Sequence, residues 1–308
     1  MREYMKDRVF VYCFYGIGNI ILKIPMLKAL DSMGYAVDVF SDTSGINVLK
    51  NEPYINILKT IDYNVKYKYV IMSLPNHNVG AYKKLRGKFI NYSFDRNKQL
   101  KMLTTTHELI ANMNLLKEAG YKGETPELSL TVDYKLVVKM KDYIDSTKKN
   151  ITLHNGSLPK NKNKRLPIDK MLTLICRLLQ KNYNVLLVGG SSEKEYESIK
   201  TSGLINLVGK LKLDETSALI SLCDCMISSD SGPMHIASAV GTPVVSFFGP
   251  TIINKNYPWG NFDNVVSSDV NCRPCYWKSR NNTCINYKCM KQINLDTILS
   301  KVGDILSA

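Results

Sequence analysis

The stretch SSDSGPMHIASAVGTPVVSFFGPT, residues 228–251, decides the fold class of this chain. Its polar start predicts the end of a strand and a tight turn at 230–232. Pro233 then suits the first turn of a helix of small residues, because its missing N–H would be unpaired there in any case. The Gly-Thr-Pro sequence at 241–243 ends that helix, and the apolar residues 244–248 predict the next buried strand. This order of strand, turn, helix and strand is typical of a parallel α/β sheet.

The turn at 230–232 has the chemistry of an anion site. It would bring backbone N–H groups and the positive end of a helix to one point, and that arrangement binds phosphate. Ser231 adds a hydroxyl donor beside them. The same residues also fit an ordinary helix cap, with Asp230 or Ser231 as the N-cap residue. The local pattern leaves a phosphate site and a plain capped helix both open.

Short apolar runs alternate with helical patterns in both halves of the chain, which indicates parallel sheets with right-handed crossovers. The polar segment 145–150 lacks apolar periodicity, so we expect one domain at 1–148 and a second at 149–308, with a last helix that can pack back on the first. Ligands of open α/β sheets bind at the carboxyl ends of strands, so the turn at 230–232 should face a cleft between the domains. The expected strands are 9–14, 36–40, 69–74, 89–92, 151–154, 185–188, 205–208, 226–229 and 244–248, and the expected helices are a segment from Gly18 to about Met33, then 168–181, 192–201, 214–222 and the helix from Pro233.

The composition is that of a globular protein, with 308 residues, 44% hydrophobic and 22% charged. The longest apolar stretch, 9–30, is interrupted by Gly, Pro and Lys, and it lacks the cleavage pattern of a signal peptide. We therefore expect a cytoplasmic protein.

The net charge of +14 suits polyanionic partners. Basic residues cluster around a single acid, Asp95, and can bind a phosphorylated glycan, an anionic lipid surface or a nucleic acid. A solvated basic face is the alternative. No known nucleic-acid-binding motif accompanies the charge, so nucleic acid is a minor option. The basic residues concerned are Lys83, Lys84, Arg86, Lys88, Arg96, Lys98 and Lys101.

The string D-S-G-P-M-H-x-A-x-A, followed by G-T-P and F-G-P-T, resembles glycosyltransferase family 9, the heptosyltransferase-like enzymes. The resemblance implies the GT-B fold, which is two Rossmann-like domains with parallel sheets facing an interdomain cleft. It also implies that the turn holds the diphosphate of a nucleotide-activated sugar. The positions that it assigns to the donor phosphates are Asp230, Ser231, Gly232, Met234 and Lys164, and it adds His235 as a catalytic residue.

Three further loops follow expected strands in the second half. Lys164 lies in a basic loop just before Leu166-Pro167, where the family has a lysine that contacts donor phosphate; a mobile solvated loop is the alternative. The family's equivalents of the other two loops cover the donor nucleoside. Glu193 could accept hydrogen bonds from ribose hydroxyls, or it could cap the helix that it begins. The nucleoside candidates are Ser191, Glu193, Gly209 and Lys210.

The loop Gly16-Ile17-Gly18-Asn19 resembles the family's N-terminal loop, in which an Asp is the suspected general base. Asn19 stands at that position, and an amide takes no proton at neutral pH. Another group then deprotonates the acceptor, or Asn19 only orients it, or activity is lost. The substitute candidates are His77, Asp95, His107 and Asp42. A dehydrogenase fingerprint is rejected, because Ile21 replaces its third Gly and Pro25 interrupts its helix.

Four cysteines at Cys272-x2-Cys275-x8-Cys284-x4-Cys289 can surround a structural metal, zinc first and iron second. Disulfides are less expected in a cytosolic protein. We expect no cofactor for catalysis, because no run of carboxylates at strand ends offers ligands for Mg²⁺. The remaining cysteines, predicted to be small core residues, are Cys13, Cys176, Cys223 and Cys225.

The resemblance predicts a metal-independent, inverting transferase that moves a sugar, ADP-heptose being the suspected donor, to a lipopolysaccharide-core-like or other anionic glycan. Peripheral contact with the inner face of the membrane follows from the basic cluster. Two alternatives remain, a catalytically inactive nucleotide-sugar-binding protein and a sugar-nucleotide epimerase. The residues expected on the acceptor side are Gly16, Gly18, Lys83, Lys84 and Arg86.

Overall fold

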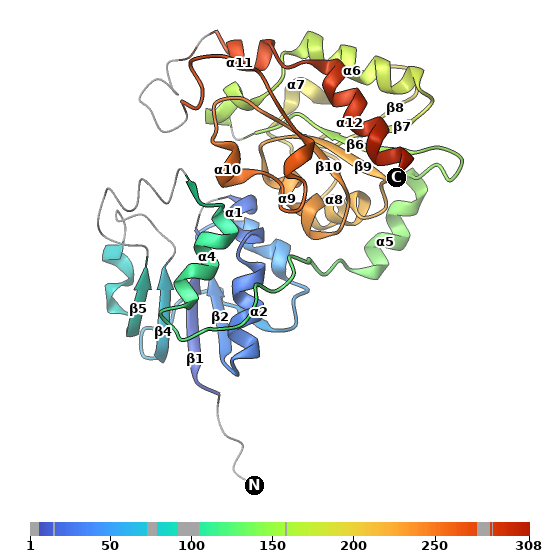
Figure 1. Cartoon of the computed structure of the whole chain (residues 1–308). Coiled ribbons are helices and arrows are strands. Elements are labelled where there is room, and N and C mark those ends of the chain that lie inside the picture. The colour runs from blue at the N-terminus through green and yellow to red at the C-terminus, as the bar shows by residue number, and fades with distance from the viewer. Residues whose placement is uncertain are drawn as a thin grey trace. The chain divides into compact units, whose positions relative to one another are not determined.

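The chain forms two compact units, the first ending at Thr131 and the second beginning at Val132 (Figure 1). The computed structural model describes residues 6–14, 16–72, 79–91, 105–157, 159–275, 284 and 286–308. Each unit contains its own parallel sheet, as the alternating pattern predicts.

In the first unit the described strands form a five-stranded sheet in the order β3-β2-β1-β4-β5, and each described pair is parallel. The central strand β1 is buried because its side chains from Val9 to Tyr12 are covered on both faces. The strands are β1 (Arg8–Tyr12), β2 (Ala36–Phe40), β3 (Ile55–Ile57), β4 (Lys66–Met72) and β5 (Arg86–Asn91). The helices are α1 (Ile17–Ile21), α2 (Ile24–Ser32) and α4 (Glu108–Leu116), with 3₁₀ segments η1 (Ser44–Leu49) and η2 (Val79–Lys84).

The single helix expected up to Met33 is two helices, α1 and α2. Pro25 lies in the first turn of α2, where its missing N–H costs no hydrogen bond. Inside one continuous helix, the same ring would clash with the carbonyl four residues earlier. The first helix therefore ends at Leu22, and the second begins after Lys23.

The second unit has a six-stranded parallel sheet in the order β11-β10-β9-β6-β7-β8. The strands are β6 (Asn150–His154), β7 (Asn184–Leu187), β8 (Leu204–Asn206), β9 (Cys225–Ser229), β10 (Val244–Phe248) and β11 (Val265–Ser267). The helices are α5 (Tyr134–Met140), α6 (Ile168–Gln180), α7 (Lys194–Glu197), α8 (Leu213–Ile220), α9 (Gly232–Ala239), α10 (Ile253–Asn256), α11 (Lys288–Lys291) and α12 (Leu295–Ser307), and the 3₁₀ segments are η3 (Lys141–Tyr143), η4 (Pro159–Lys164) and η5 (Phe262–Asn264).

The division between the units lies before the polar segment at which we expect it. Helix α5 belongs to the second unit, because Met140 is buried in one cluster with Leu186 and Leu219. Lys139 of α5 also forms an ion pair with Glu215 of α8, at 2.6 Å. The polar residues after α5 are therefore a loop within the second unit.

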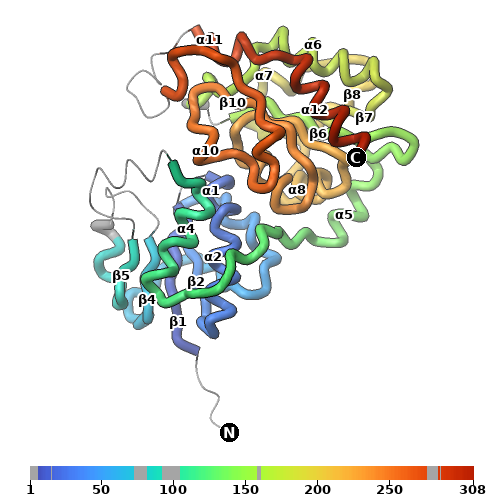
Figure 2. Tube along the Cα trace, in the orientation of Figure 1, coloured from blue at the N-terminus to red at the C-terminus, as the bar shows by residue number. Residues whose placement is uncertain are grey.

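The sequence led us to expect that the last helix can pack back on the first domain, but α12 packs on the sheet of its own unit. Its buried residues Ile298, Leu299 and Val302 share a core cluster with Phe247 of β10. Figure 2 shows the red end of the chain returning to α6 and the strands of this sheet.

Helix α7 is shorter than the expected 192–201. The side-chain amide of Asn206 donates to the carbonyl oxygens of Tyr196, Glu197 and Ile199, at 2.8, 3.3 and 3.0 Å. These carbonyls are thus bonded to β8 instead of to a further helical turn. Over the described residues, the longest helices are too short or too polar to cross a bilayer.

Candidate functional site

The turn at 230–232 lies at the carboxyl end of β9, between β10 and β6 in the middle of the second sheet. Helix α9 follows at once, with Pro233 in its first turn. Ser231 is the N-cap residue and its backbone is extended, yet its side chain makes no capping hydrogen bond. The backbone therefore has the geometry of a cap, while the hydroxyl points to other partners.

The hydroxyl of Ser231 belongs to a buried polar chain that ends in a carboxylate. Ser231 Oγ lies 3.0 Å from His154 Nδ1, and His154 Nε2 lies 3.4 Å from Glu193 Oε2. The backbone N–H of Gly190 donates to the same Glu193 oxygen at 3.0 Å. The His154 and Glu193 residues are only 4% and 5% exposed. Burial, the largest single influence, would raise the pKa of Glu193, but the hydrogen bond and charge of His154, the Gly190 N–H and the charge of Arg165 together hold that pKa below its usual value.

Glu193 thus has a different environment from the one that we expect. It is the N-cap residue of α7 by position, but its side chain makes no capping hydrogen bond and is bonded to His154 and Gly190 instead. Its predicted contact with a ribose stays a prediction. His154 is not among the predicted site residues; the only signal for it is a histidine at the end of a strand that pairs with β9.

Gly156 lets this chain of polar groups pack closely. A side-chain methyl at this position would collide with Glu193 Oε1 and His154 Nε2. The carbonyl oxygen of Gly156 also accepts a hydrogen bond from Ser229 Oγ at 2.6 Å, which ties the loop after β6 to the end of β9.

Lys164 and Asp230, both predicted from the sequence, are brought together. Lys164 Nζ donates to Asp230 Oδ2 at 2.9 Å, and the two side chains are 12% and 6% exposed. An ionised carboxylate is only an acceptor, so Asp230 has no donor for a phosphate oxygen. Its observed role is to hold the Lys164 ammonium beside the turn.

The remaining donor candidates are distributed over neighbouring loops. Met234 and His235 are buried in the first turns of α9. Gly209 N donates to Gly189 O at 3.0 Å, so the loops after β7 and β8 are adjacent, and Ser191 lies in the first of them. What these residues contact in a bound donor stays a prediction.

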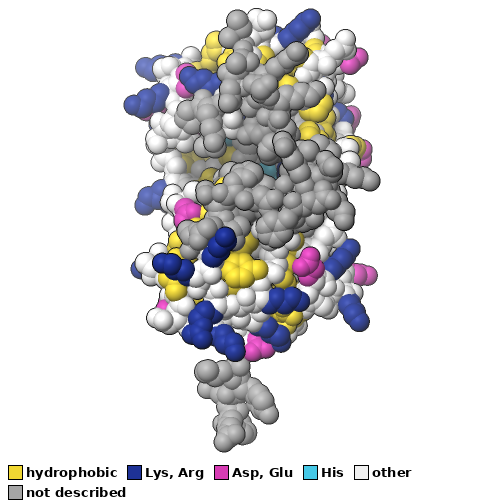
Figure 3. All heavy atoms as spheres, turned by 90° about the vertical axis from the view of Figure 1, so that its left-hand side faces the viewer, with side chains coloured by type: hydrophobic (Ala, Val, Ile, Leu, Met, Phe, Trp, Pro, Cys, Tyr) yellow, Lys and Arg dark blue, Asp and Glu magenta, His cyan; other side chains and the backbone are white. Residues whose placement is uncertain are grey.

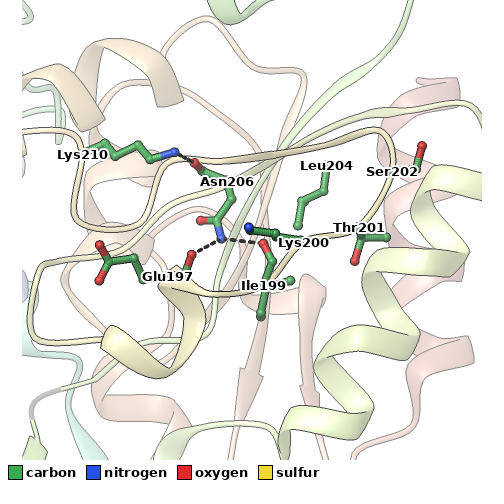
Figure 4. A pocket seen from close by; sticks show the side chains of 8 residues that line it. All are labelled: Glu197, Ile199, Lys200, Thr201, Ser202, Leu204, Asn206 and Lys210. Carbon is green, nitrogen blue, oxygen red and sulfur yellow. Dashed lines mark hydrogen bonds between the residues drawn. The ribbon is translucent and has the colours of Figure 1, made fainter.

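A pocket of about 490 Å³ lies beside β8 and includes one of the predicted residues, Lys210 (Figure 4). Lys210 Nζ donates to the carbonyl oxygen of Asn206 at 2.7 Å, and the Asn206 side chain is directed to the end of α7. The residues of the turn at 230–232 are not part of its lining. The lining residues are Glu197, Ile199, Lys200, Thr201, Ser202, Leu204, Asn206 and Lys210.

In the first unit, the loop after β1 leads into α1, with Gly16 as N-cap residue and Gly18 and Asn19 inside the helix. Two substitute bases, His77 and Asp95, lie outside the described residues. His107 is buried, and its Nδ1 caps α4 by accepting from Leu109 N at 3.2 Å. Asp42 is exposed and accepts hydrogen bonds from two tyrosines.

The described part of the basic cluster is exposed on η2 and β5, at Lys83, Lys84, Arg86 and Lys88. Figure 3 views the molecule from the side of β5 and shows Lys and Arg side chains gathered around exposed apolar ones. Arg96, Lys98 and Lys101 lie outside the described residues.

The four cysteines predicted as a metal site do not form one in the part of the chain that the structure describes, where no three His, Cys, Asp or Glu side chains come together for a metal ion. Cys275 and Cys289 are buried, Cys284 is half-buried and Cys272 is exposed. Burial, with the neighbouring cysteines, raises the pKa of Cys289 to about 11.

Three of the other four cysteines are core residues as predicted, namely Cys13, Cys223 and Cys225. Cys176 is exposed, contrary to the prediction, because it lies on the outer face of α6.

Comparison with known proteins adds three findings. The family model described as glycosyltransferase family 9 (heptosyltransferase) matches residues 71–286. Lipooligosaccharide heptosyltransferase 2 of Campylobacter jejuni is 30% identical over 136 residues, which is 41% of each chain. Lipopolysaccharide heptosyltransferase 1 of Campylobacter coli is 24% identical, over 88% of this chain and 92% of the relative. The chain thus spans less than half of the first relative and nearly all of the second.

Among solved structures, a glycosyl transferase family 9 protein from Veillonella parvula is similar over 98% of this chain and 97% of its own, with a TM-score of 0.77 and 19% identity. The ADP-heptose lipopolysaccharide heptosyltransferase II of E. coli is similar over 97% and 98%, with a TM-score of 0.74 and 16% identity. These likenesses concern the fold, and the two parallel-sheet domains are those of the GT-B class.

Proposed function

Because this chain belongs to glycosyltransferase family 9, we propose that it transfers a sugar from a nucleotide-diphosphate sugar to a glycan of the lipopolysaccharide-core type, with inversion at the anomeric carbon. ADP-heptose is the proposed donor. Relatives named as heptosyltransferases support this proposal, as do similar structures of E. coli WaaC titled with ADP and with ADP-2-deoxy-2-fluoro heptose. The same comparisons favour transfer over the inactive and epimerase alternatives.

The observation that carries the proposal is the Lys164–Asp230 pair at the N-terminus of α9. It places a cation beside a turn whose N-cap side chain leaves the helix end uncapped. A diphosphate bound there would meet backbone N–H groups, the positive helix end and the Lys164 ammonium. The same groups would stabilise the charge that grows on the leaving nucleoside diphosphate, in a site that is already organised.

In the proposed reaction, the acceptor hydroxyl attacks the anomeric carbon from the face opposite the nucleotide. One displacement inverts the configuration, and the bond to the phosphate oxygen breaks as the new glycosidic bond forms. The donor subsite is assigned to the second unit and the acceptor subsite to the first. Holding both reactants in line accounts for much of the rate acceleration in such a step.

We assign the acceptor's negative groups, or an anionic membrane surface beside it, to the exposed cluster at Lys83, Lys84 and Arg86. Attraction of this kind is weakened by salt. Reversing these three charges should weaken acceptor binding and leave nucleotide affinity unchanged. The proposed location is cytoplasmic, at the inner face of the membrane.

The spacing of the four cysteines also supports a structural zinc or iron ion, although the described residues do not by themselves form that site. A structural neighbour, TibC from enterotoxigenic E. coli, is titled an iron-containing dodecameric glycosyltransferase, at 13% identity and a TM-score of 0.67. Elemental analysis of the purified chain should find about one equivalent of metal, lost in a variant with Cys272 and Cys275 replaced by Ser. A metal-free, stably folded chain would contradict this assignment. No step of the reaction uses the metal.

Calorimetry with ADP, UDP and GDP tests the donor subsite, followed by a transfer assay with the sugar form of the best ligand. The variant Ser231→Ala should lower nucleotide affinity by about 10-fold, the effect of losing one hydrogen bond to a charged group. The matched control is Ser267→Ala, an exposed serine at the end of β11 in the same unit. Absence of nucleotide binding in the wild type, or equal affinity in the two variants, would overturn the donor subsite.

A further inference from the structure

A carboxylate in the first unit is held by two tyrosine hydroxyls. Tyr82 Oη donates to Asp42 Oδ2 at 3.0 Å and lies 3.3 Å from Oδ1. Tyr12 Oη also donates to Oδ2. Both hydroxyls thus bind mainly one oxygen, which leaves acceptor capacity on Oδ1.

The two tyrosines are fixed behind this carboxylate. Tyr12 is 2% exposed, and its ring centroid lies 4.7 Å from that of Tyr82, 5.8 Å from that of Phe14 and 6.3 Å from that of Phe40. Burial, followed by the hydrogen bond to Asp42, raises the pKa of Tyr12 far above its usual value. Burial also raises the pKa of Tyr82. Both hydroxyls therefore stay protonated as donors at neutral pH, while Asp42 itself is exposed to solvent.

Asp42 lies at the carboxyl end of the first sheet, where the chain also places Asn19. Strands β1 and β2 are parallel, with Tyr12 opposite Phe40, so the loops that follow them are neighbours. Cys13 N donates to Phe40 O at 2.7 Å, which joins these loops directly. Helix α1, which contains Asn19, packs on η1, which begins two residues after Asp42. Carboxyl ends of parallel strands are where open α/β sheets bind their substrates.

We propose that Asp42 is the general base of the transfer reaction, with Tyr12 and Tyr82 as its positioning residues. The assignment rests on the proposed function. Oδ1 takes the proton of the acceptor hydroxyl while that oxygen forms the bond to the anomeric carbon. The bond from that carbon to the phosphate oxygen breaks, and its electron pair leaves with the nucleoside diphosphate. The proton on Asp42 then passes to water.

Asn19 and His107 fit this role less well. The amide of Asn19 cannot accept a proton at neutral pH. His107 is buried, and its Nδ1 is engaged at the start of α4. Asp42, by contrast, combines an exposed carboxylate with two fixed donors on one oxygen.

Four variants test the assignment. One of them moves the carboxylate from position 42 to position 19, at the same carboxyl end of the sheet. Asp42→Asn should lower kcat by about 10²- to 10⁴-fold, the usual contribution of general acid–base catalysis, and leave nucleotide affinity unchanged. Adding Asn19→Asp to that variant should restore part of the lost rate, because it returns a carboxylate to the same carboxyl end of the sheet. Asp42→Glu keeps a carboxylate and should retain more activity than Asp42→Asn. The matched control is Asp62→Asn, an exposed carboxylate in a loop of the same unit.

The variant Tyr82→Phe separates positioning from folding. It keeps the ring packing and removes one donor, so kcat should fall by about 10-fold with little change in KM or melting temperature. A kcat for Asp42→Asn within about threefold of that for Asp62→Asn would overturn the assignment. So would a wild-type level of transfer in Asp42→Asn with unchanged nucleotide binding, and the proposed function would then stand. If the wild type transfers no sugar from any nucleotide sugar that it binds, both the assignment of Asp42 and the proposed function are overturned.

Discussion

Replacing Lys164 by methionine removes one charge of a buried ion pair and keeps most of the side chain's apolar volume. Asp230 would be left with its side chain only 6% exposed and without the ammonium that now lies 2.9 Å away. Breaking a buried pair in this way costs about 3–5 kcal/mol, because an uncompensated charge stays behind. In a unit the size of residues 132–308, each kcal/mol lowers the melting temperature by about 2–4 °C. We therefore expect the unfolding transition of the second unit to fall by about 6–20 °C.

The double variant, Lys164→Met with Asp230→Asn, removes both charges and leaves no buried ion. It should be more stable than Lys164→Met alone, because replacing a complete buried pair by neutral groups is often close to neutral. A double-mutant cycle isolates this difference as a coupling free energy. The same variants, measured by calorimetry with ADP, test the proposed contact between Lys164 and a donor phosphate. Loss of one hydrogen bond to a charged phosphate should weaken ADP binding by about 10- to 150-fold.

The matched control is Lys162→Met, an exposed lysine in the same 3₁₀ segment, η4. Its melting temperature and ADP affinity should stay near those of the wild type, because exposed charges contribute little. Equal melting temperatures for Lys164→Met and Lys162→Met would refute the argument for the buried pair. Additive effects of the two changes at Lys164 and Asp230 would refute the coupling.

Three further changes probe the polar chain and the core of the second unit. Gly156→Ala should destabilise the protein by about 1–3 kcal/mol, measured by urea unfolding, because the added methyl collides with Glu193 and His154. Glu193→Gln tests the lowered pKa of that carboxyl: the wild type's stability advantage should be present above the usual pKa of 4.5 and be lost as the pH falls through the lower folded value. Equal pH dependence of the urea midpoints would contradict this. Phe247→Ala should cost about 3–5 kcal/mol, since Phe247 is fully buried in β10.

The regular elements were predictable where the chain gives strong local signals. Strands β2 and β10 begin and end at the residues expected from the sequence, because apolar runs there are bounded by Gly, Pro or polar residues. A last helix was expected as well, and Leu295, Ile298, Leu299 and Val302 of α12 follow helical spacing. The true boundary between the units depends on the packing of α5 against α8, which no local pattern encodes.

The candidate site was predictable only in part, for a similar reason. The turn at 230–232 carries its own sequence signal, and Lys164 followed from the resemblance. His154 and Gly156 matter because the fold brings them to Glu193 and Ser231, which are distant in sequence. The selection of Asp42 among four candidate bases likewise required knowing which side chains reach it.

A carboxylate inside the proposed phosphate site looks unfavourable, because like charges repel. The Lys164–Asp230 pair offers a physical reason for it. Ordering a free lysine side chain costs up to about 1.5–2 kcal/mol of rotamer entropy, and Asp230 holds the chain in place before any ligand arrives. An ammonium has three N–H donors, so it can bind the carboxylate and a phosphate oxygen together. In the proposed donor subsite, Asp230 would therefore preorganise the cation for the diphosphate, and the helix end would supply the additional positive potential that the pair, neutral as a whole, does not.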